Sequence, residues 1–337
     1  MIQFMFRYLD MLLDYVEPTH LLFIAVDGPP PRAKMMQQRE RRFIKDYESR
    51  LNMRTSKKQL DHSDRWDSNQ ITPGTKFMEK VAAGLTAYIA QKLEDHPNSQ
   101  FKIILSDGSV PGEGEHKILD FIRNLRFRGD YRPNARHLLF SNDADMIFLT
   151  LLLHERNAYL MRDLPVPRNR RDRTNLFQTK FSMVDFKQLT LYMMRDFAPN
   201  RCNFAHFEYD IDRIIDDFVF LAYFAGNDFI PHLPFMNMRD GAYEYLLQKY
   251  KACGPVLPSY LVDGCHIQFA ALNVYLCALA EDEEDLLMFR TFGFRDKLQQ
   301  EEKFRSQRAA RRQPVCAQGV FDHEQPISDS PHLKFKQ

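Results

Sequence analysis

His137-Leu138-Leu139-Phe140-Ser141-Asn142-Asp143-Ala144-Asp145 is the stretch around which this chain is organised. A short apolar run typical of a strand leads directly into two carboxylates that are separated by one residue. Two carboxylates at about 4 Å repel by roughly 4 kcal/mol at an effective dielectric near 20, so they share a proton or a cation. An isolated segment of this kind is more often a turn or a helix cap. The same order, a strand and then an acid, recurs along the chain and favours a shared site.

Hydrophobic periodicity alternates between short buried strands and amphipathic helices over most of the chain. Strands are expected over residues 21–26, 101–105, 138–140 and 158–161. Helices are expected over residues 2–16, 32–51, 75–93, 146–153, 184–195, 241–250 and 267–279, with one more after Glu115 and one that runs from Ile214 towards Gly226. This alternation predicts an α/β fold with a largely parallel sheet flanked by helices.

The acids that follow these strands form a candidate metal-binding set. They are Asp27, Glu113, Glu115, Asp143 and Asp145, joined by Asp228 from a glycine–proline break. In α/β sheets ligands bind beyond the carboxyl ends of the strands, where these acids are expected to converge. Acids at a helix N-terminus are also common through the helix dipole, so the two glutamates alone are weak evidence. Because no His/Cys cluster competes, the set predicts Mg²⁺ or Mn²⁺, and two such ions serve phosphodiester hydrolysis.

The helix expected after Pro29-Pro30-Pro31 has two different faces. Its cationic face carries Lys34, Gln38, Arg41 and Arg42, and its apolar face, predicted to be core, carries Met36, Phe43, Tyr47 and Leu51. Residues 29–58 hold ten Lys or Arg against three acids, in a chain with a net charge of only +1. A basic helical face is often simply solvated, but Lys and Arg one turn apart also grip phosphate.

The composition bounds the remaining possibilities. With 337 residues, 44% hydrophobic, the chain can bury a large core, and we expect one domain over residues 1–300 and a poorly ordered tail, first basic and then Pro- and Ser-rich, over 301–337. Five scattered cysteines without a C-x-x-C pair argue against a disulfide framework and a structural zinc site. They fit an intracellular location, nuclear or cytoplasmic. No apolar run reaches the length of a membrane span, so no membrane partner is expected.

Four motifs in this chain give it a specific resemblance. They are Asp27-Gly28-Pro29-Pro30-Pro31-Arg32-Ala33-Lys34-Met35-Met36-Gln37-Gln38-Arg39-Glu40-Arg41-Arg42-Phe43, Pro111-Gly112-Glu113-Gly114-Glu115-His116-Lys117-Ile118, Asp143-Ala144-Asp145, and Gly226-Asn227-Asp228-Phe229-Ile230-Pro231-His232-Leu233-Pro234. Their content and order resemble the Xrn family of 5′→3′ exoribonucleases over about residues 4–290.

The resemblance implies a core related to PIN-like and flap-endonuclease-like nucleases. It implies that the metal ligands and catalytic residues are Asp27, Glu113, Glu115, Asp143, Asp145 and Asp228, and that Lys34, Gln38, Arg41 and Arg42 bind the 5′-monophosphate of an RNA. The expected activity is 5′→3′ hydrolysis of RNA with a 5′-monophosphate, with two Mg²⁺ or Mn²⁺ ions, in RNA decay or processing.

The chain also departs from the family pattern. Family members begin with a further strand and an Asp-x-Asn-x-x-x-His segment, which is missing here, and their second conserved region is absent after about residue 300. We therefore expect a truncated product or fragment of a longer nuclease. Two other readings stay open: a catalytically inactive RNA-binding or scaffold protein, and a structure-specific DNA nuclease of the related flap family, which the Arg32–Phe43 segment disfavours.

Overall fold

The structure, a computed structural model, describes residues 1–55, 66–95, 101–128, 131–164, 180–199, 202–236, 238 and 241–292. The chain divides into two units, Met1–Glu283 and Glu284–Gln337. In the second unit, residues 284–292 are helical. The expected tail at 301–337 and the expected domain boundary at residue 300 lie outside the described residues.

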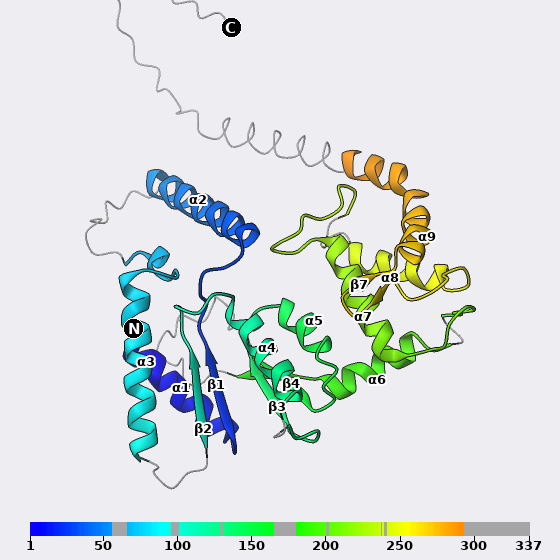
Figure 1. Ribbon diagram of the computed structural model, residues 1–337. Coiled ribbons are helices and arrows are strands. Elements are labelled where there is room, and N and C mark those ends of the chain that lie inside the picture. Colours follow the sequence, from blue (N-terminus) through cyan, green and yellow to red (C-terminus); the bar gives the residue numbers. More distant parts are fainter. Residues whose placement is uncertain are drawn as a thin grey trace, which may run out of the picture. The chain divides into compact units, whose positions relative to one another are not determined.

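The strands of the described part pair into small sheets (Figure 1). They are β1 (Leu21–Ala25), β2 (Lys102–Ser106), β3 (His137–Phe140), β4 (Ala158–Asp163), β5 (Phe181–Asp185), β6 (Val262–Asp263) and β7 (His266–Ile267). The β1–β2 and β3–β4 pairs are parallel, whereas β5 runs antiparallel to β4, and β6 and β7 form an antiparallel pair. The mixed α/β class is confirmed.

The prediction of one largely parallel sheet is wrong in its extent. The hydrogen-bonded strand orders that the structure describes are β1-β2, β3-β4-β5 and β6-β7. Strand β5 runs antiparallel to β4, and the pairing extends past the strand ends, where Leu164 N–H donates to the Lys180 carbonyl at 2.8 Å. Alternation along the chain predicts the strands themselves, but long-range hydrogen bonds decide which edges pair.

The helices lie close to the predicted ranges. They are α1 (Ile2–Val16), α2 (Arg32–Thr55), α3 (Lys76–Asp95), α4 (Gly114–Arg126), α5 (Asp145–Leu151), α6 (Phe186–Asp196), α7 (Ile211–Ala222), α8 (Ala242–Cys253) and α9 (Phe269–Ala280), with 3-10 turns η2 (Ser68–Gln70) and η4 (Tyr223–Ala225). The helix expected from residue 184 begins at Phe186, because Asp185 caps it by accepting the N–H groups of Lys187 and Gln188.

Helix α1 packs between helix α3 and the sheet of β3, β4 and β5. The Phe6 ring stacks on Tyr88 of α3 with 5.0 Å between centroids, and a Cβ on Gly84 would come within 3.1 Å of Phe6. Its other side reaches the second sheet, where the Tyr8 hydroxyl donates to Asp163 Oδ1 at 2.6 Å. The Tyr8 ring also lies 6.1 Å from that of Phe140 on β3. Helix α1 therefore links α3 to the sheet whose strand β3 precedes Asp143 and Asp145.

Helix α2 reverses the packing predicted from its sequence. Met36, Phe43 and Tyr47, expected in the core, are 61%, 65% and 66% exposed, and the side chain of Leu51 lies outside the described part. Lys34, on the face expected to be cationic, is only 8% exposed. The prediction of the core face is wrong because charge-assisted hydrogen bonds to carboxylates hold the cationic face against the protein.

The α7–α9 region is organised around a buried carboxylate. Asp217 of α7 is fully buried, and its oxygens accept three hydrogen bonds. The donors are the Tyr250 hydroxyl at 2.6 Å and the N–H groups of Leu261 and Val262, both at 2.9 Å. Burial raises the pKa of Asp217 to about 6, against the opposing effect of these hydrogen bonds. One side chain thus ties α8 and the start of β6 to α7.

Two further observations concern the cysteines and the hydropathy of the helices. Cys202, Cys253, Cys265 and Cys277, the four cysteines in the described part, form no disulfide with one another. Among the described helices, none has the length and the apolar character that crossing a membrane requires.

Candidate functional site

The site begins where two turns interlock at the carboxyl ends of β1 and β2. Gly28 N–H donates to the Gly112 carbonyl at 2.9 Å, and Gly112 N–H donates to the Pro29 carbonyl at 3.1 Å. A Cβ on Gly28 would lie 1.8 Å from the Val110 carbonyl oxygen, so no other residue fits this approach. Gly112 has a φ of 107°, a conformation that glycine tolerates. The turn after β2 is therefore docked on the turn after β1.

The start of α4 is fixed to the same two strands. Gly114 N–H donates to Asp27 Oδ1 at 2.7 Å, so Asp27 reaches the first residue of the helix. Lys117 Nζ donates to the carbonyls of Val26 and Asp107, each at 2.8 Å. Burial lowers the pKa of Lys117, and the charges of Asp27 and Asp107 oppose this shift. These bonds hold the beginning of α4 rigidly, and with it the glutamates on either side of Gly114.

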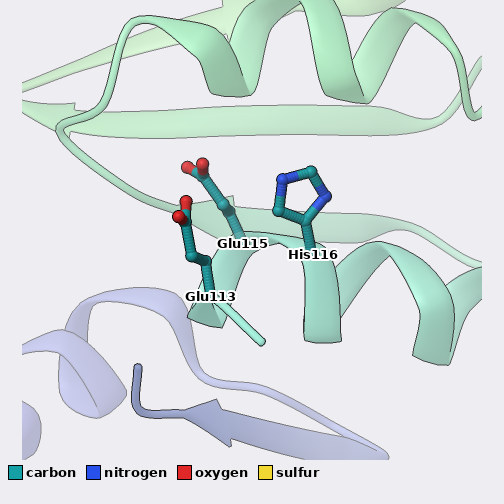
Figure 2. Close-up of side chains that lie close together, drawn as sticks. All are labelled: Glu113, Glu115 and His116. Atoms are coloured by element: carbon teal, nitrogen blue, oxygen red, sulfur yellow. The ribbon is translucent and has the colours of Figure 1, made fainter. Parts of the chain in front are cut away.

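Glu113 and Glu115 direct their carboxylates to the same side of the start of α4, and His116 stands beside them (Figure 2). One ligand atom from each of these three residues lies within 4.8 Å of the others. The His116 ring also meets Phe229 edge-on, with 6.0 Å between centroids. Burial first, and then the charges of Asp143 and Glu113, raise the pKa of Glu115 to about 7. Asp143, although distant in sequence, is thus close enough to Glu115 for their charges to interact.

Asp143 and Asp145 follow the end of β3, and their charges act on Glu115. The turn is shaped by Asp143 N–H, which donates to Ser141 Oγ at 3.1 Å, and α5 then begins at Asp145. Burial, followed by the charges of Asp143 and Asp228, raises the pKa of Asp145. The structure therefore brings the acids of β3 together with Asp228, which lies more than 80 residues further along the chain.

The loop after η4 presents Asp228 through a tightly built turn. Asn227 Oδ1 accepts the N–H groups of Phe229 at 2.9 Å and Ile230 at 2.7 Å, while Asn227 N–H donates to the Ile230 carbonyl at 2.9 Å. Gly226 has a φ of 85°, and a Cβ there would lie 2.7 Å from the His232 nitrogen. The Asn227 side chain thus accepts the backbone N–H groups of this turn. The conformation and the close contact at position 226 require glycine.

Helix α2 supplies cations to the acids. Lys34 Nζ pairs with Glu113 Oε2 at 3.3 Å and makes a direct ion pair with Asp228 Oδ2. Asp228 Oδ1 accepts from Gln37 Nε2 at 2.8 Å and from Arg41 Nη2 at 3.2 Å. Residues 34, 37 and 41 are spaced by three and four positions, so they lie on one helical face.

The other two α2 residues predicted for the site are placed differently. Arg42 Nη2 donates to Thr72 Oγ1 at 3.0 Å, so this guanidinium reaches the segment after η2. Gln38 is half-buried, and the amide that reaches Asp228 belongs to its neighbour Gln37. The roles of all four residues, Lys34, Gln38, Arg41 and Arg42, in binding a phosphate stay predictions.

Negative charge is in excess at this site. Its acids are Glu113, Glu115, Asp143, Asp145 and Asp228, and the cations of the described part that contact them are Lys34 and Arg41. Glu113 Oε1 is buried and accepts no hydrogen bond from the described residues. A buried carboxylate oxygen without a donor is costly unless a cation binds it. The donor set is almost entirely oxygen, which suits Mg²⁺ or Mn²⁺ better than Zn²⁺.

Four residues near the site were not predicted from the sequence: Gln37, His116, Lys117 and Asn227. Lys117 lies one turn before Phe121 on the apolar face of its helix, which is a weak signal of burial. Asn227 follows a glycine and precedes the acid, a pattern typical of a side-chain-stabilised turn. The contacts of Gln37 and His116 arise only from tertiary packing, because their partners Asp228 and Phe229 lie over a hundred residues away.

Acids that gather beyond the ends of parallel strands, next to a cationic helix, are typical of metal-dependent enzymes that act on phosphodiesters. Comparison with known proteins agrees with this class. A family model described as XRN 5′-3′ exonuclease N-terminus matches residues 1–164, and one described as Xrn1 helical domain matches residues 208–332. The chain belongs to the Xrn family.

Curated relatives include the 5′-3′ exoribonuclease 2 of Schizosaccharomyces pombe, 38% identical over 316 residues, covering 83% of this chain and 32% of the relative. The 5′-3′ exoribonuclease 1 of the same yeast is 38% identical over 289 residues, covering 83% and 22%. The 5′-3′ exoribonuclease 2 of Saccharomyces cerevisiae is 36% identical over 315 residues, covering 85% and 31%. The chain therefore spans about a third or less of the length of these relatives.

Proposed function

We propose that this chain is the nuclease part of a 5′→3′ exoribonuclease that hydrolyses RNA with a 5′-monophosphate in RNA decay or processing. The observation that carries the proposal is the convergence of acids from the ends of β2 and β3 and from the Asp228 loop against the cationic face of α2. The names of the relatives support the same activity. A core related to PIN-like and flap-endonuclease-like nucleases is part of this proposal.

The acidic cluster fits two Mg²⁺ or Mn²⁺ ions, which would be held by Asp27, Glu113, Glu115, Asp143, Asp145 and Asp228. When bound, such ions acidify a water molecule and stabilise charge on the scissile phosphate. The residues of the chain hold the acids in position. The interlocked turns and the Asn227 turn fix the acids before the substrate arrives, which avoids reorganisation during the reaction.

The cationic face of α2 is proposed to bind the 5′-terminal phosphate through Lys34, Gln38, Arg41 and Arg42. Arg41 is exposed while its guanidinium contacts Asp228, so it can reach a phosphate without leaving the neighbourhood of the acids. Guanidinium groups bind phosphate oxygens in a bidentate manner, which favours a terminal monophosphate with free oxygens over an internal phosphodiester. A terminal phosphate held at a constant distance from the acids would restrict each cycle to one nucleotide.

An end-labelled RNA assay tests this function directly. The purified chain in Mg²⁺ should shorten RNA with a 5′-monophosphate one nucleotide at a time, roughly tenfold or more faster than RNA with a 5′-hydroxyl. Chelation of divalent ions should stop the reaction. Binding without shortening would instead support an inactive RNA-binding protein, and faster cutting of branched DNA would support a flap-type nuclease.

Lys117 is expected to position the glutamates for this reaction. Lys117→Met removes both hydrogen bonds that tie α4 to the ends of β1 and β2, so Glu113 and Glu115 lose their fixed placement. We expect turnover to fall by roughly 10- to 100-fold and the Mg²⁺ concentration for half-maximal rate to rise. The matched control is Lys187→Met on the exposed side of α6. An unchanged Mg²⁺ requirement in Lys117→Met would contradict the positioning role.

A further inference from the structure

The ammonium group of Lys34 lies inside the acidic cluster. The residue is 8% exposed, although α2 leaves its apolar face in solvent. Its Nζ contacts two carboxylates from different parts of the chain: Glu113 Oε2 at 3.3 Å, and Asp228 Oδ2 in a direct ion pair. The same Nζ lies 5.5 Å from the centre of the Phe229 ring, a distance that allows a cation–π contact.

The carboxylates that hold Lys34 belong to the set proposed to hold divalent ions. Glu113 offers one oxygen to Lys34, and its other oxygen is buried without a donor among the residues that the structure describes. Asp228 is surrounded by Lys34, Gln37 and Arg41, so both of its oxygens already accept hydrogen bonds. A divalent ion that takes an oxygen from either carboxylate must therefore act against the positive charge of Lys34.

We propose that Lys34 is a built-in counter-cation of the acidic cluster, which divalent ions displace when they bind. This inference rests on the proposed function, because it concerns the same acids and the same ions. Displacement frees the ammonium for the 5′-phosphate of the RNA, so loading of the metal and gripping of the substrate are coupled. Lys34 then acts against the metal and in favour of the substrate.

A merely structural role for Lys34 predicts the opposite effect on metal binding. If the ion pairs served to hold Glu113 and Asp228 in place for the metal, removing the lysine would weaken metal binding. If Lys34 competes for these carboxylates, removing it strengthens metal binding, because the lysine charge no longer offsets theirs. The sign of the change in metal affinity therefore separates the two roles.

The test measures Mn²⁺ binding by electron paramagnetic resonance in the wild-type chain and in Lys34→Met, after a thermal melt has shown that the variant is folded. We expect the Lys34→Met variant to bind Mn²⁺ roughly tenfold more tightly and to bind 5′-phosphorylated RNA more weakly. Lys45→Met is the control, since Lys45 lies on the same helix and donates to Ser68 Oγ at 2.6 Å. Weaker or unchanged Mn²⁺ binding in Lys34→Met overturns the inference.

A second measurement uses the unaltered chain and does not depend on the folding of a variant. Covalent labelling of lysine amines, read residue by residue by mass spectrometry, should modify Lys34 faster in Mg²⁺ than in a chelator, while Lys45 stays unchanged. Slower or equal labelling of Lys34 overturns the inference. A wild-type chain that binds no Mn²⁺ removes the proposed function and this inference with it, whereas a wild-type chain that binds Mn²⁺ without exposing Lys34 removes only the inference.

Discussion

Asp145→Asn should lower the rate of RNA hydrolysis by roughly a thousandfold while leaving the protein folded. The exchange keeps the shape of the side chain and removes a charge proposed to hold a divalent ion. In a chelating buffer the variant should melt at a higher temperature than the wild type, because burial and the charges of Asp143 and Asp228 disfavour ionised Asp145. Activity and stability are thus expected to change in opposite directions.

The matched control for Asp145→Asn is Asp120→Asn on helix α4. The Asp120 side chain is 71% exposed and lies 3.8 Å from Arg123, so its replacement should change neither quantity. Rates are measured on 5′-monophosphorylated RNA in Mg²⁺, and melting is followed by circular dichroism with a chelator present. A variant that retains more than about a tenth of the wild-type rate would show that Asp145 is not part of the reacting site.

Asp217→Ala should cost about 3 to 5 kcal/mol of unfolding free energy, the largest loss of stability that we expect from a single substitution outside the site. The alanine leaves the Tyr250 hydroxyl and the N–H groups of Leu261 and Val262 buried without an acceptor. These donors belong to α8 and to the segment at β6, so their loss should loosen the whole α7–α9 region.

A graded series makes the Asp217 prediction sharper. Tyr250→Phe removes one of the three hydrogen bonds and should cost about 1 to 2 kcal/mol, and Asp217→Asn should fall between the two because it keeps one acceptor oxygen. The control, Glu244→Ala, lies on the exposed side of α8. Urea unfolding followed by circular dichroism gives the unfolding free energy of each variant and so their order of stability. If Asp217→Ala is no less stable than Glu244→Ala, the carboxylate does not organise this region.

The sequence predicts the secondary structure well where hydrophobic periodicity is strong. The helix expected over residues 2–16 is observed as Ile2–Val16, and the strand expected over 138–140 is observed as His137–Phe140. The prediction was less accurate at 181–185, where β5 precedes α6. Residue Val184 has the apolar character of either element, and the partner strand β4 decides between them.

Part of the geometry of the candidate site follows from a general rule about parallel strands. Acids that follow strands converge because parallel strands share an edge, and this rule holds for β1 with β2. The structure places Lys34 and Arg41 of α2 in ion pairs with the acids, whereas the apolar face of the helix, predicted to be core, is exposed. Periodicity shows that a helix has an apolar and a polar face. Which of the two faces is buried depends on the residues that pack against the helix.

By itself, the amino-acid sequence determined the residue types of the site, their place after strands and in a glycine-bound turn, and the family to which the chain belongs. The tertiary structure alone decided that Lys34 is buried among carboxylates, that Gln37 reaches Asp228, and that Lys117 ties α4 to two strand ends. The physical reason is that hydrophobic patterns and turn preferences act over a few residues. Ion pairs and hydrogen bonds between segments almost two hundred residues apart form only when the whole unit is folded.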